Sequence, residues 1–299
     1  MVTFMDIHTN SFMQKMQNPA NSSDADPLAA YRIEQQPYYQ PWGNEIALYH
    51  HAYQSRLPLL LKGPTGCGKT RFVEYMAWML KRPLITLACN EDMTASDLVG
   101  RYLLDAGGTA WHDGPLTLAV RHGGICYLDE VVEARQDTTV VIHPLTDARR
   151  ILPLDKKGEL VHAHPDFQLV ISYNPGYQSH VKDLKTSTRQ RFAALEFDYP
   201  LPELEAGIVT RETDISHALA RQLVSLAQST RALKNRGLDE GASTRMLIYA
   251  GLLLREGVSV HDSCEMTITR ALTDDPDTAL ALSQLVEAHF GPRTLTTSA

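Results

Sequence analysis

Several features that would place this 299-residue chain in a membrane, outside the cell or on nucleic acid are missing from its sequence. No apolar run reaches the roughly 18–20 residues that a helix needs to cross a bilayer. The N-terminus has no apolar segment followed by a cleavage site. A formal net charge of −7 leaves no basic excess for a nucleic-acid partner. We therefore expect a cytoplasmic protein that binds no membrane and does not work mainly on nucleic acid.

Metal-binding and disulfide patterns are also missing. The four cysteines, Cys67, Cys89, Cys126 and Cys264, form no Cys-x-x-Cys pair, and three of them lie in or beside apolar runs. Such cysteines are typical of buried free thiols in a reducing compartment. His50 and His51, and likewise His162 and His164, have no evident third ligand, so we interpret them as surface residues.

What the sequence does contain is an alternation of strand and helix signals. Five short apolar runs, each bounded by glycine, proline or polar residues, predict buried strands of a parallel sheet at residues 57–63, 83–89, 123–130, 167–174 and 193–199. Residues 70–82 have helical periodicity and complete a βαβ unit with the first two runs. After residue 202 only helical patterns follow, at residues 215–233, 242–257 and 277–291.

These patterns predict two domains and no internal repeat. We expect a flexible, polar N-terminal segment at residues 1–30, because this stretch is aperiodic. We place an α/β domain at residues 31–200 and a small all-helical domain at residues 201–299.

The motif with the clearest chemistry is "GPTGCGKT", which runs from Gly63 to Thr70. It matches G-x-x-x-x-G-K-[ST] and lies between a predicted strand and a predicted helix, as a phosphate-binding loop must. Backbone N–H groups and the helix N-terminus supply partial positive charge for a phosphate. We expect Lys69 to reach the β- and γ-phosphates of ATP and Thr70 to hold Mg²⁺. The candidate nucleotide-binding residues are Gly63, Pro64, Thr65, Gly66, Cys67, Gly68, Lys69, Thr70, Arg71 and Asp129.

The second motif, "ICYLDE", is a predicted strand that ends in two carboxylates. Asp129 is suited to orient Mg²⁺ through water, and Glu130 is suited to polarise the attacking water. Together they predict hydrolysis and not only binding of the nucleotide. Asn174 ends a further strand and either orients that water or simply forms an Asn-Pro turn. Arg245 either contacts the phosphates from the helical domain or is an ordinary helix arginine.

Two more arginines, Arg189 and Arg191 in "TSTRQRF", need an anionic partner if they are buried. They precede the last predicted strand, which we expect on the far side of the sheet from Lys69. Their partner is either a carboxylate of their own chain or a phosphate held by a neighbouring copy.

In this order, the phosphate-binding loop, "YLDE", "SYNP", "STRQRF" and "GASTR" resemble the motifs of a AAA+ ATPase of the MoxR type. Longer stretches such as "TASDLVGRYLL", "WHDGPLTLAV" and "YLDEVVEARQDT" resemble the CbbQ/NorQ/GvpN family over about residues 37–255, with the CbbQ branch closest. The resemblance implies a AAA+ P-loop NTPase fold, with a central parallel sheet followed by a helical lid.

The resemblance also implies a role for each matching residue. It assigns the loop to Walker A, Asp129 and Glu130 to Walker B, Asn174 to sensor 1, Arg245 to sensor 2, and Arg189 and Arg191 to the arginine-finger region. Residues 98–116 correspond to the helix-2 insert and residues 150–167 to the hairpin before sensor 1. In a ring, the arginine fingers would face the nucleotide of the adjacent subunit.

Finally, the resemblance implies partners. The family forms homohexamers, hydrolyses ATP with Mg²⁺ and works with an adaptor that carries a von Willebrand factor A domain (CbbO-like). Its CbbQ branch activates Rubisco by removing inhibitory sugar phosphates, its NorQ branch matures nitric oxide reductase, and its GvpN branch serves gas-vesicle assembly. We expect a remodelling ATPase with Rubisco as client. The alternatives are NorQ-like maturation and a nucleic-acid-associated AAA+ motor, which the net charge disfavours.

Overall fold

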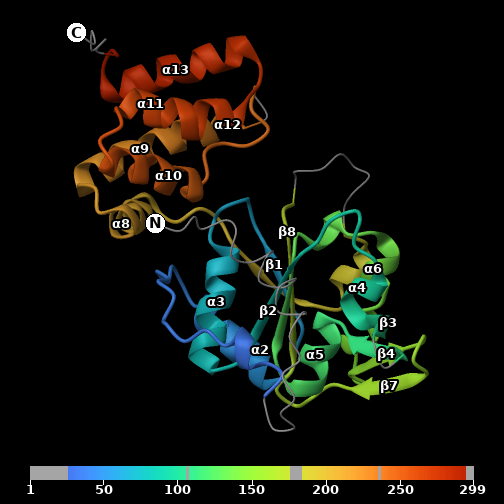
Figure 1. Cartoon of the computed structure of the whole chain (residues 1–299). Coiled ribbons are helices and arrows are strands. Elements are labelled where there is room, and N and C mark those ends of the chain that lie inside the picture. Colours follow the sequence, from blue (N-terminus) through green and yellow to red (C-terminus); the bar gives the residue numbers. More distant parts are fainter. Residues whose placement is uncertain (1–25, 106–107, 176–183, 235–236, 294–299) are drawn as a thin grey trace.

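The computed structural model describes residues 26–105, 108–175, 184–234 and 237–293 (Figure 1). Most of the N-terminal segment that we expect to be flexible lies outside these residues. Within the described residues, no helix is long and apolar enough to cross a bilayer.

A five-stranded parallel sheet forms the centre of the N-terminal part (Figure 1). Its strands are β1 (Leu59–Lys62), β2 (Leu84–Ala88), β5 (Ile125–Asp129), β8 (Gln168–Tyr173) and β9 (Ala193–Glu196), in the order β2-β5-β8-β1-β9. All five strands predicted from the apolar runs are confirmed. The predicted βαβ unit is present, but its two strands are not neighbours in the sheet. Helix α3 (Lys69–Leu80) connects β1 to β2, and β8 and β5 lie between these two strands.

Helices cover both faces of this sheet. Alternate residues of a strand point to opposite faces. Accordingly, Leu59 and Leu61 pack with α3 and α2 (Glu45–Gln54), whereas Leu60 packs with α5 (Pro115–His122) (Figure 1). Burial of both faces explains why the strands read as continuous apolar runs.

Shorter elements complete this part of the chain. They are η1 (Ala29–Tyr31), α4 (Ala95–Val99), η2 (Val131–Glu133), α6 (Gln136–Val140), η3 (His143–Leu145) and α7 (Thr186–Arg189). Two antiparallel hairpins occupy the two predicted inserts: β3 (Gly100–Asp105) with β4 (Gly108–Asp113), and β6 (Ile151–Leu154) with β7 (Glu159–His162). Arg121 on α5 forms ion pairs with Asp113, at 2.7 Å, and with Glu159, at 2.6 Å. Both hairpins are therefore tied to the same helix.

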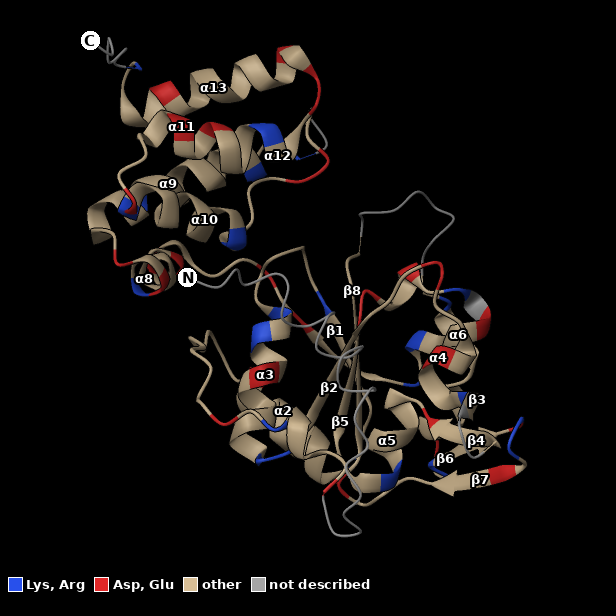
Figure 2. Cartoon of the chain, viewed as in Figure 1, with Lys and Arg blue, Asp and Glu red and all other residues tan. Residues whose placement is uncertain are grey.

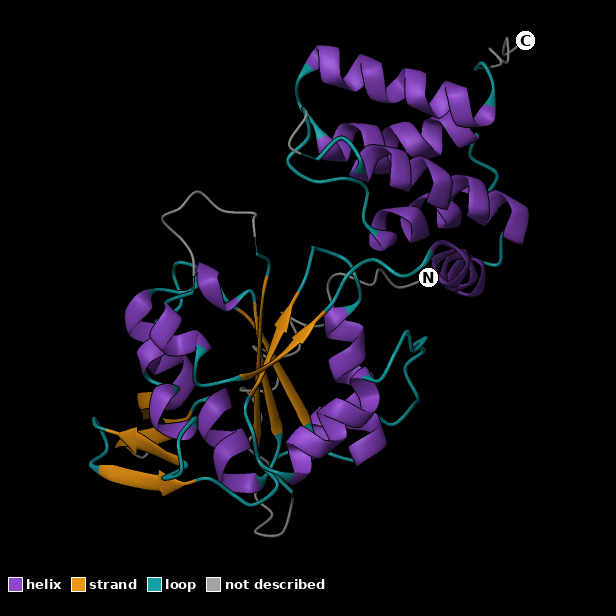
Figure 3. Ribbon diagram, turned by 180° about the vertical axis from the view of Figure 1, so that it is seen from behind, coloured by secondary structure: helices purple, strands orange, loops and turns teal. Residues whose placement is uncertain are grey.

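The described C-terminal residues are helical (Figure 3). The elements are α8 (Pro202–Thr213), α9 (His217–Arg231), α10 (Thr244–Arg255), α11 (Val260–Cys264), the π-helical η4 (Glu265–Thr269), α12 (Arg270–Leu272) and α13 (Pro276–Phe290). They share one apolar core that includes Leu223, Leu247 and Ile268. The predicted order, an α/β sheet followed by helices, is confirmed; α8 and the α11–α12 segment were not predicted.

Charged residues and cysteines both occur in the two parts of the chain. Acidic and basic residues are interspersed over the helices of both parts (Figure 2). All four cysteines are buried and free, as predicted.

Candidate functional site

The predicted phosphate-binding loop connects β1 to α3, and two of its glycines are fixed by close approaches. Gly63 and Gly66 have φ values of +154° and +68°. A Cβ on Gly63 would lie 2.5 Å from the carbonyl oxygen of Phe197, and one on Gly66 would lie 2.8 Å from the Cβ of Ser243. Real Cβ atoms do not tolerate such distances, so both positions require glycine.

Lys69, the first residue of α3, points back into this loop. Its Nζ donates to the carbonyl oxygens of Gly63 and Pro64 and to Oδ1 of Asn174, each at 2.8 Å. These acceptors use the three donors of the ammonium group. The residue is only 7% exposed, and this burial lowers the pKa of Lys69.

The Asn174 side chain contacts the phosphate-binding loop, so this residue does more than form an Asn-Pro turn. Besides accepting from Lys69, it donates through Nδ2 to Oγ1 of Thr65 at 2.6 Å. The end of β8 is thereby connected to the phosphate-binding loop at two points.

The first carboxylate after β5 meets the start of α3. The Thr70 hydroxyl donates to Oδ2 of Asp129 at 3.0 Å, and the Tyr127 hydroxyl donates to Oδ1 at 2.7 Å. Ser172 donates to the same Oδ1. A hydroxyl and a carboxylate side by side are the oxygen ligands that Mg²⁺ prefers beside a nucleotide, so this pair fits the predicted metal.

Glu130 follows directly, in a left-handed backbone conformation with φ of +55°. Its backbone N–H donates to Oγ of Ser172 at 3.1 Å. Desolvation of its carboxylate, together with the charges of Asp129 and Glu133, raises the pKa of Glu130. A raised pKa suits a group that accepts a proton during catalysis.

Ser172 is a site residue that the sequence analysis missed. It is fully buried on β8, yet its hydroxyl contacts both Asp129 and the backbone of Glu130. The available signal was a single hydroxyl within the apolar run "FQLVISYN", which neighbours the strand that ends in the two carboxylates.

Arg245 approaches the loop from the helical part. Ser243 caps α10 by accepting from the backbone N–H of Met246. A Cβ on Gly66 would lie 3.3 Å from the Cβ of Arg245, so the first turn of α10 rests on the loop. The positive charge of Arg245 also opposes the rise in the pKa of Glu130. The structure thus brings Arg245 together with the predicted Walker residues.

Arg189 and Arg191 are not brought to this site. The backbone N–H of Ala193 donates to the Pro58 carbonyl at the amino end of β1, whereas the loop follows the carboxyl end. Four strand residues, about 13 Å, separate the two ends. We expected β9 on the far side of the sheet from Lys69, and this was wrong, because β9 pairs directly with β1. The arginines are nevertheless separated from the loop, because they precede the amino end of β9 whereas the loop follows the carboxyl end of β1.

Arg71 lies on the exposed side of α3. Its guanidinium pairs with Glu74 at 3.5 Å. This contact lies within α3 and does not involve the loop.

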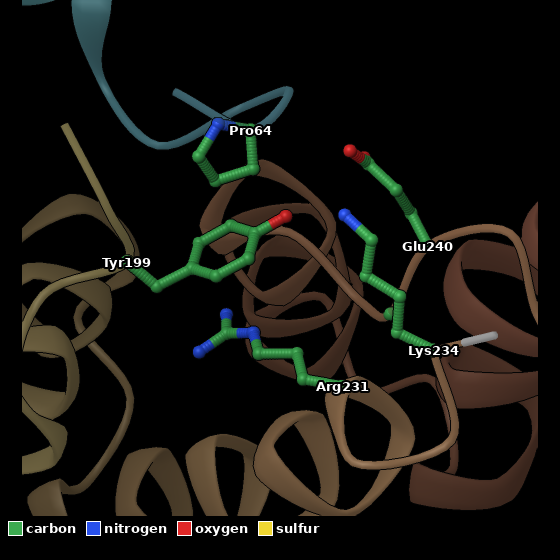
Figure 4. Close-up of a pocket in the computed structure, with 6 residues that line it drawn as sticks. Pro64, Tyr199, Arg231, Lys234 and Glu240 are labelled. Carbon is green, nitrogen blue, oxygen red and sulfur yellow. The ribbon is translucent and has the colours of Figure 1, made fainter. Parts of the chain in front are cut away.

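A pocket beside the loop was not predicted. It lies between the two parts of the chain and is lined by Pro64, Tyr199, Arg231, Lys234, Glu240 and Gly241 (Figure 4). The Tyr199 hydroxyl donates to the Thr65 carbonyl at 3.2 Å. The linker that leads from β9 to α8 is therefore in direct contact with the phosphate-binding loop.

Two family models match successive parts of the chain. Residues 58–192 match the AAA domain of the dynein-related subfamily, and residues 205–289 match the CbbQ/NirQ/NorQ C-terminal domain. Both descriptions agree with the resemblance found in the motifs.

Curated relatives cover most of the chain. Protein CbbQ of Hydrogenophilus thermoluteolus is 64% identical over 87% of this chain and 97% of its own length. The denitrification regulatory protein NirQ of Stutzerimonas stutzeri is 54% identical over 85% of this chain and 93% of its own length. Protein NorQ of Paracoccus denitrificans is 55% identical over 85% of this chain and 94% of its own length.

Among solved structures, a point mutant of RuvB from Thermotoga maritima matches with a TM-score of 0.50. The match covers 84% of this chain and 71% of that one, at 16% sequence identity, and so supports the fold alone. The relatives and both family models lead to one conclusion: the chain is an ATPase that belongs to the CbbQ/NirQ/NorQ family of AAA proteins.

Proposed function

We propose that this ATPase remodels a client protein and that the client is Rubisco, from which it releases inhibitory sugar phosphates. The observation that carries the choice of client is the 64% identity to a protein CbbQ, against 54–55% for the NirQ and NorQ relatives. The motifs resemble the CbbQ branch, whose clients are Rubisco enzymes.

The proposed chemistry uses the residues that meet at the loop. Thr70 and Asp129 would hold Mg²⁺, which would neutralise charge on the phosphates of bound ATP. Lys69 exchanges its carbonyl acceptors for phosphate oxygens. Glu130 accepts the proton of the attacking water, and Asn174 orients that water.

Arg245 completes the site from the lid. Its helix begins against Gly66, so its guanidinium is supported next to the position of the phosphates. A cation there stabilises the charge that develops during phosphoryl transfer.

The proposal includes a homohexameric ring in the cytoplasm, where ATP is available. In this ring, Arg189 or Arg191 reaches the γ-phosphate held by the adjacent subunit. The placement of α7 at the edge of the sheet opposite the loop supports action on a neighbour over action within the chain.

An adaptor with a von Willebrand factor A domain is the proposed route to the client. Besides the central sheet, the described α/β part contains two hairpins, β3–β4 and β6–β7. The two hairpins offer only a small surface. A separate protein that recruits Rubisco would explain how the chain selects so large an enzyme.

Reactivation of inhibited Rubisco tests this function. Rubisco loaded with an inhibitory sugar phosphate is incubated with the chain, the adaptor and ATP, and its carboxylation rate is followed. We expect recovery that requires ATP and is lost with Glu130→Gln. Failure of the active ATPase and adaptor to restore any carboxylation would refute the choice of client.

A second client has a specific observation in its favour. The NirQ and NorQ relatives match at 54–55% identity over 85% of the chain, so maturation of nitric oxide reductase is the alternative. Nitric oxide reductase activity, measured in cells with and without the gene for this chain, separates the two clients. A nucleic-acid motor has less support, because the RuvB match shows the fold alone.

A further inference from the structure

Arg231, the last residue of α9, is held rigidly within the lid. Its guanidinium donates to both carboxylate oxygens of Glu205, at 2.8 and 2.6 Å, and through Nε to the carbonyl of Ala242 at 2.8 Å. Glu205 is fully buried. A bidentate pair of this kind fixes orientation as well as charge.

The same carboxylate fixes the start of α10. The Thr244 hydroxyl donates to Oε1 of Glu205 at 2.6 Å, and Thr244 is the first residue of that helix. A Cβ on Gly241 would lie 2.4 Å from Cα of Arg231, so the segment before α10 passes directly against α9. Glu205 therefore joins α8, α9 and the residue that precedes Arg245.

The side of the Arg231 guanidinium that faces out of the lid contacts the linker between β9 and α8. Its Cζ lies 3.7 Å from the centroid of the Tyr199 ring. Figure 4 shows Tyr199 between Pro64 of the loop and Arg231 of the lid. Since the Tyr199 hydroxyl donates to the Thr65 carbonyl, one aromatic side chain connects the loop with the rigid unit that carries α10.

We propose that Tyr199 and Arg231 are positioning residues for ATP hydrolysis, whose stacked contact holds the lid so that Arg245 lies over the phosphate-binding loop. This inference rests on the proposed role of Arg245. Thr244 is tied through Glu205 to Arg231, so the distance from Arg245 to the loop depends on where Arg231 stacks. Loss of the stack lets the lid rotate about residues 199–202 and withdraws Arg245.

Substitution of Tyr199 tests the stack without disturbing the buried ion pair. Tyr199→Leu removes the aromatic face, and we expect kcat to fall about tenfold with little change in KM. Tyr199→Phe keeps the face, and we expect kcat within about threefold of the parent. Tyr249→Leu, which removes an exposed tyrosine of α10, is the matched control and should leave kcat unchanged. Arg231 itself is not substituted, because Glu205 would remain buried without its cation.

A double-mutant cycle shows whether the effect passes through Arg245. If Tyr199 acts by placing Arg245, then Tyr199→Leu costs little further kcat in an Arg245→Ala background. Independent, multiplying effects would overturn the proposal, as would a rise in KM at unchanged kcat, which would make Tyr199 a nucleotide contact. If Arg245→Ala alone leaves kcat unchanged, the assigned role of Arg245 fails and the proposal fails with it.

Discussion

At the scale of single residues, two charged groups of the site, Lys69 and Asp129, already have partners within the chain. Lys69 donates to three oxygens, and Asp129 accepts from three hydroxyls. ATP must therefore exchange existing hydrogen bonds for new ones and does not simply fill unpaired groups. The net gain per exchanged bond is small, about 1 kcal/mol, so the charge of the phosphates dominates binding.

Glu130→Gln should separate binding from turnover. The amide keeps the size of the side chain but cannot accept a proton from water, so the rate should fall on the order of 10²-fold or more while nucleotide affinity is retained. Phosphate release and nucleotide affinity are measured for both forms. Near-normal turnover in the variant would remove Glu130 from the mechanism.

Glu133→Gln tests the electrostatics of the same carboxylate. Burial, and then the charges of Asp129 and Glu133, raise the pKa of Glu130, so protonation should reduce kcat at a higher pH than for a free glutamate. Removing the charge of Glu133 lowers that pKa, and the acid limb of the kcat–pH profile should move to lower pH. An unmoved limb would contradict this, and Glu256→Gln in the lid serves as the control.

Ser172→Ala tests the residue that the sequence analysis missed. It removes a hydrogen bond to the Asp129 carboxylate and leaves the N–H of Glu130 without its acceptor, so kcat should fall about tenfold or more. Ser263→Ala is the control, because Ser263 is also fully buried but its hydroxyl has no hydrogen-bond partner among the described residues. Equal effects of the two changes would assign Ser172 to stability alone.

At the scale of elements, the sequence predicts strands better than their order. Both faces of the sheet are covered, so strands such as β5 and β8 are unbroken apolar runs that stand out in the sequence. Strand order depends on contacts between distant residues, and for this reason the position of β9 was mispredicted.

Local signals also decide which site residues are predictable. The glycines and Lys69 belong to one continuous motif, and so their place in the site followed from spacing. Tyr199 of the linker and Arg231 of the lid come together from distant positions in the sequence, and neither belongs to a motif. Helix α8 had a signal that was overlooked, because Pro202 and two glutamates open it.

Arg189, the last residue of α7, and Arg191, two residues later, are the subject of the prediction for this scale. Arg189→Ala/Arg191→Ala and Lys69→Ala should each abolish turnover, since an arginine finger is worth about 10³–10⁵ in rate and the lysine binds the phosphates. If the proposed ring forms, mixed rings would contain some interfaces where an intact loop faces an intact arginine. ATPase activity of mixtures at several ratios should therefore return in part.

Two controls define the outcome of the mixing test. Co-assembly of the two variants is verified by a tag on one of them. A dilution series of the parent protein into each variant shows whether a ring needs every site intact. Activity that stays absent in co-assembled rings, when parent subunits do tolerate inactive neighbours, would place both arginines within their own subunit.

At the scale of the whole molecule, the fold separates a motor from the surfaces that would meet a client. The lid packs around its own core and touches the loop through α10, and the linker touches the loop through Tyr199. The two hairpins lie on the other part of the chain, where Arg121 ties both to α5. Since α5 leads into β5, which ends at Asp129 and Glu130, both hairpins are connected to the strand that carries the hydrolytic residues.

The proposed adaptor gives the prediction for this scale. The hairpins are short and rigidly held, so we expect the purified chain to hydrolyse ATP but to leave inhibited Rubisco inactive. Addition of the von Willebrand factor A-domain protein should restore carboxylation in proportion to ATP turnover. Lys69→Ala with the adaptor is the matched control, because it keeps both hairpins and removes only the motor. Full reactivation by the chain alone would rule out the adaptor and would assign client recognition to the hairpins themselves.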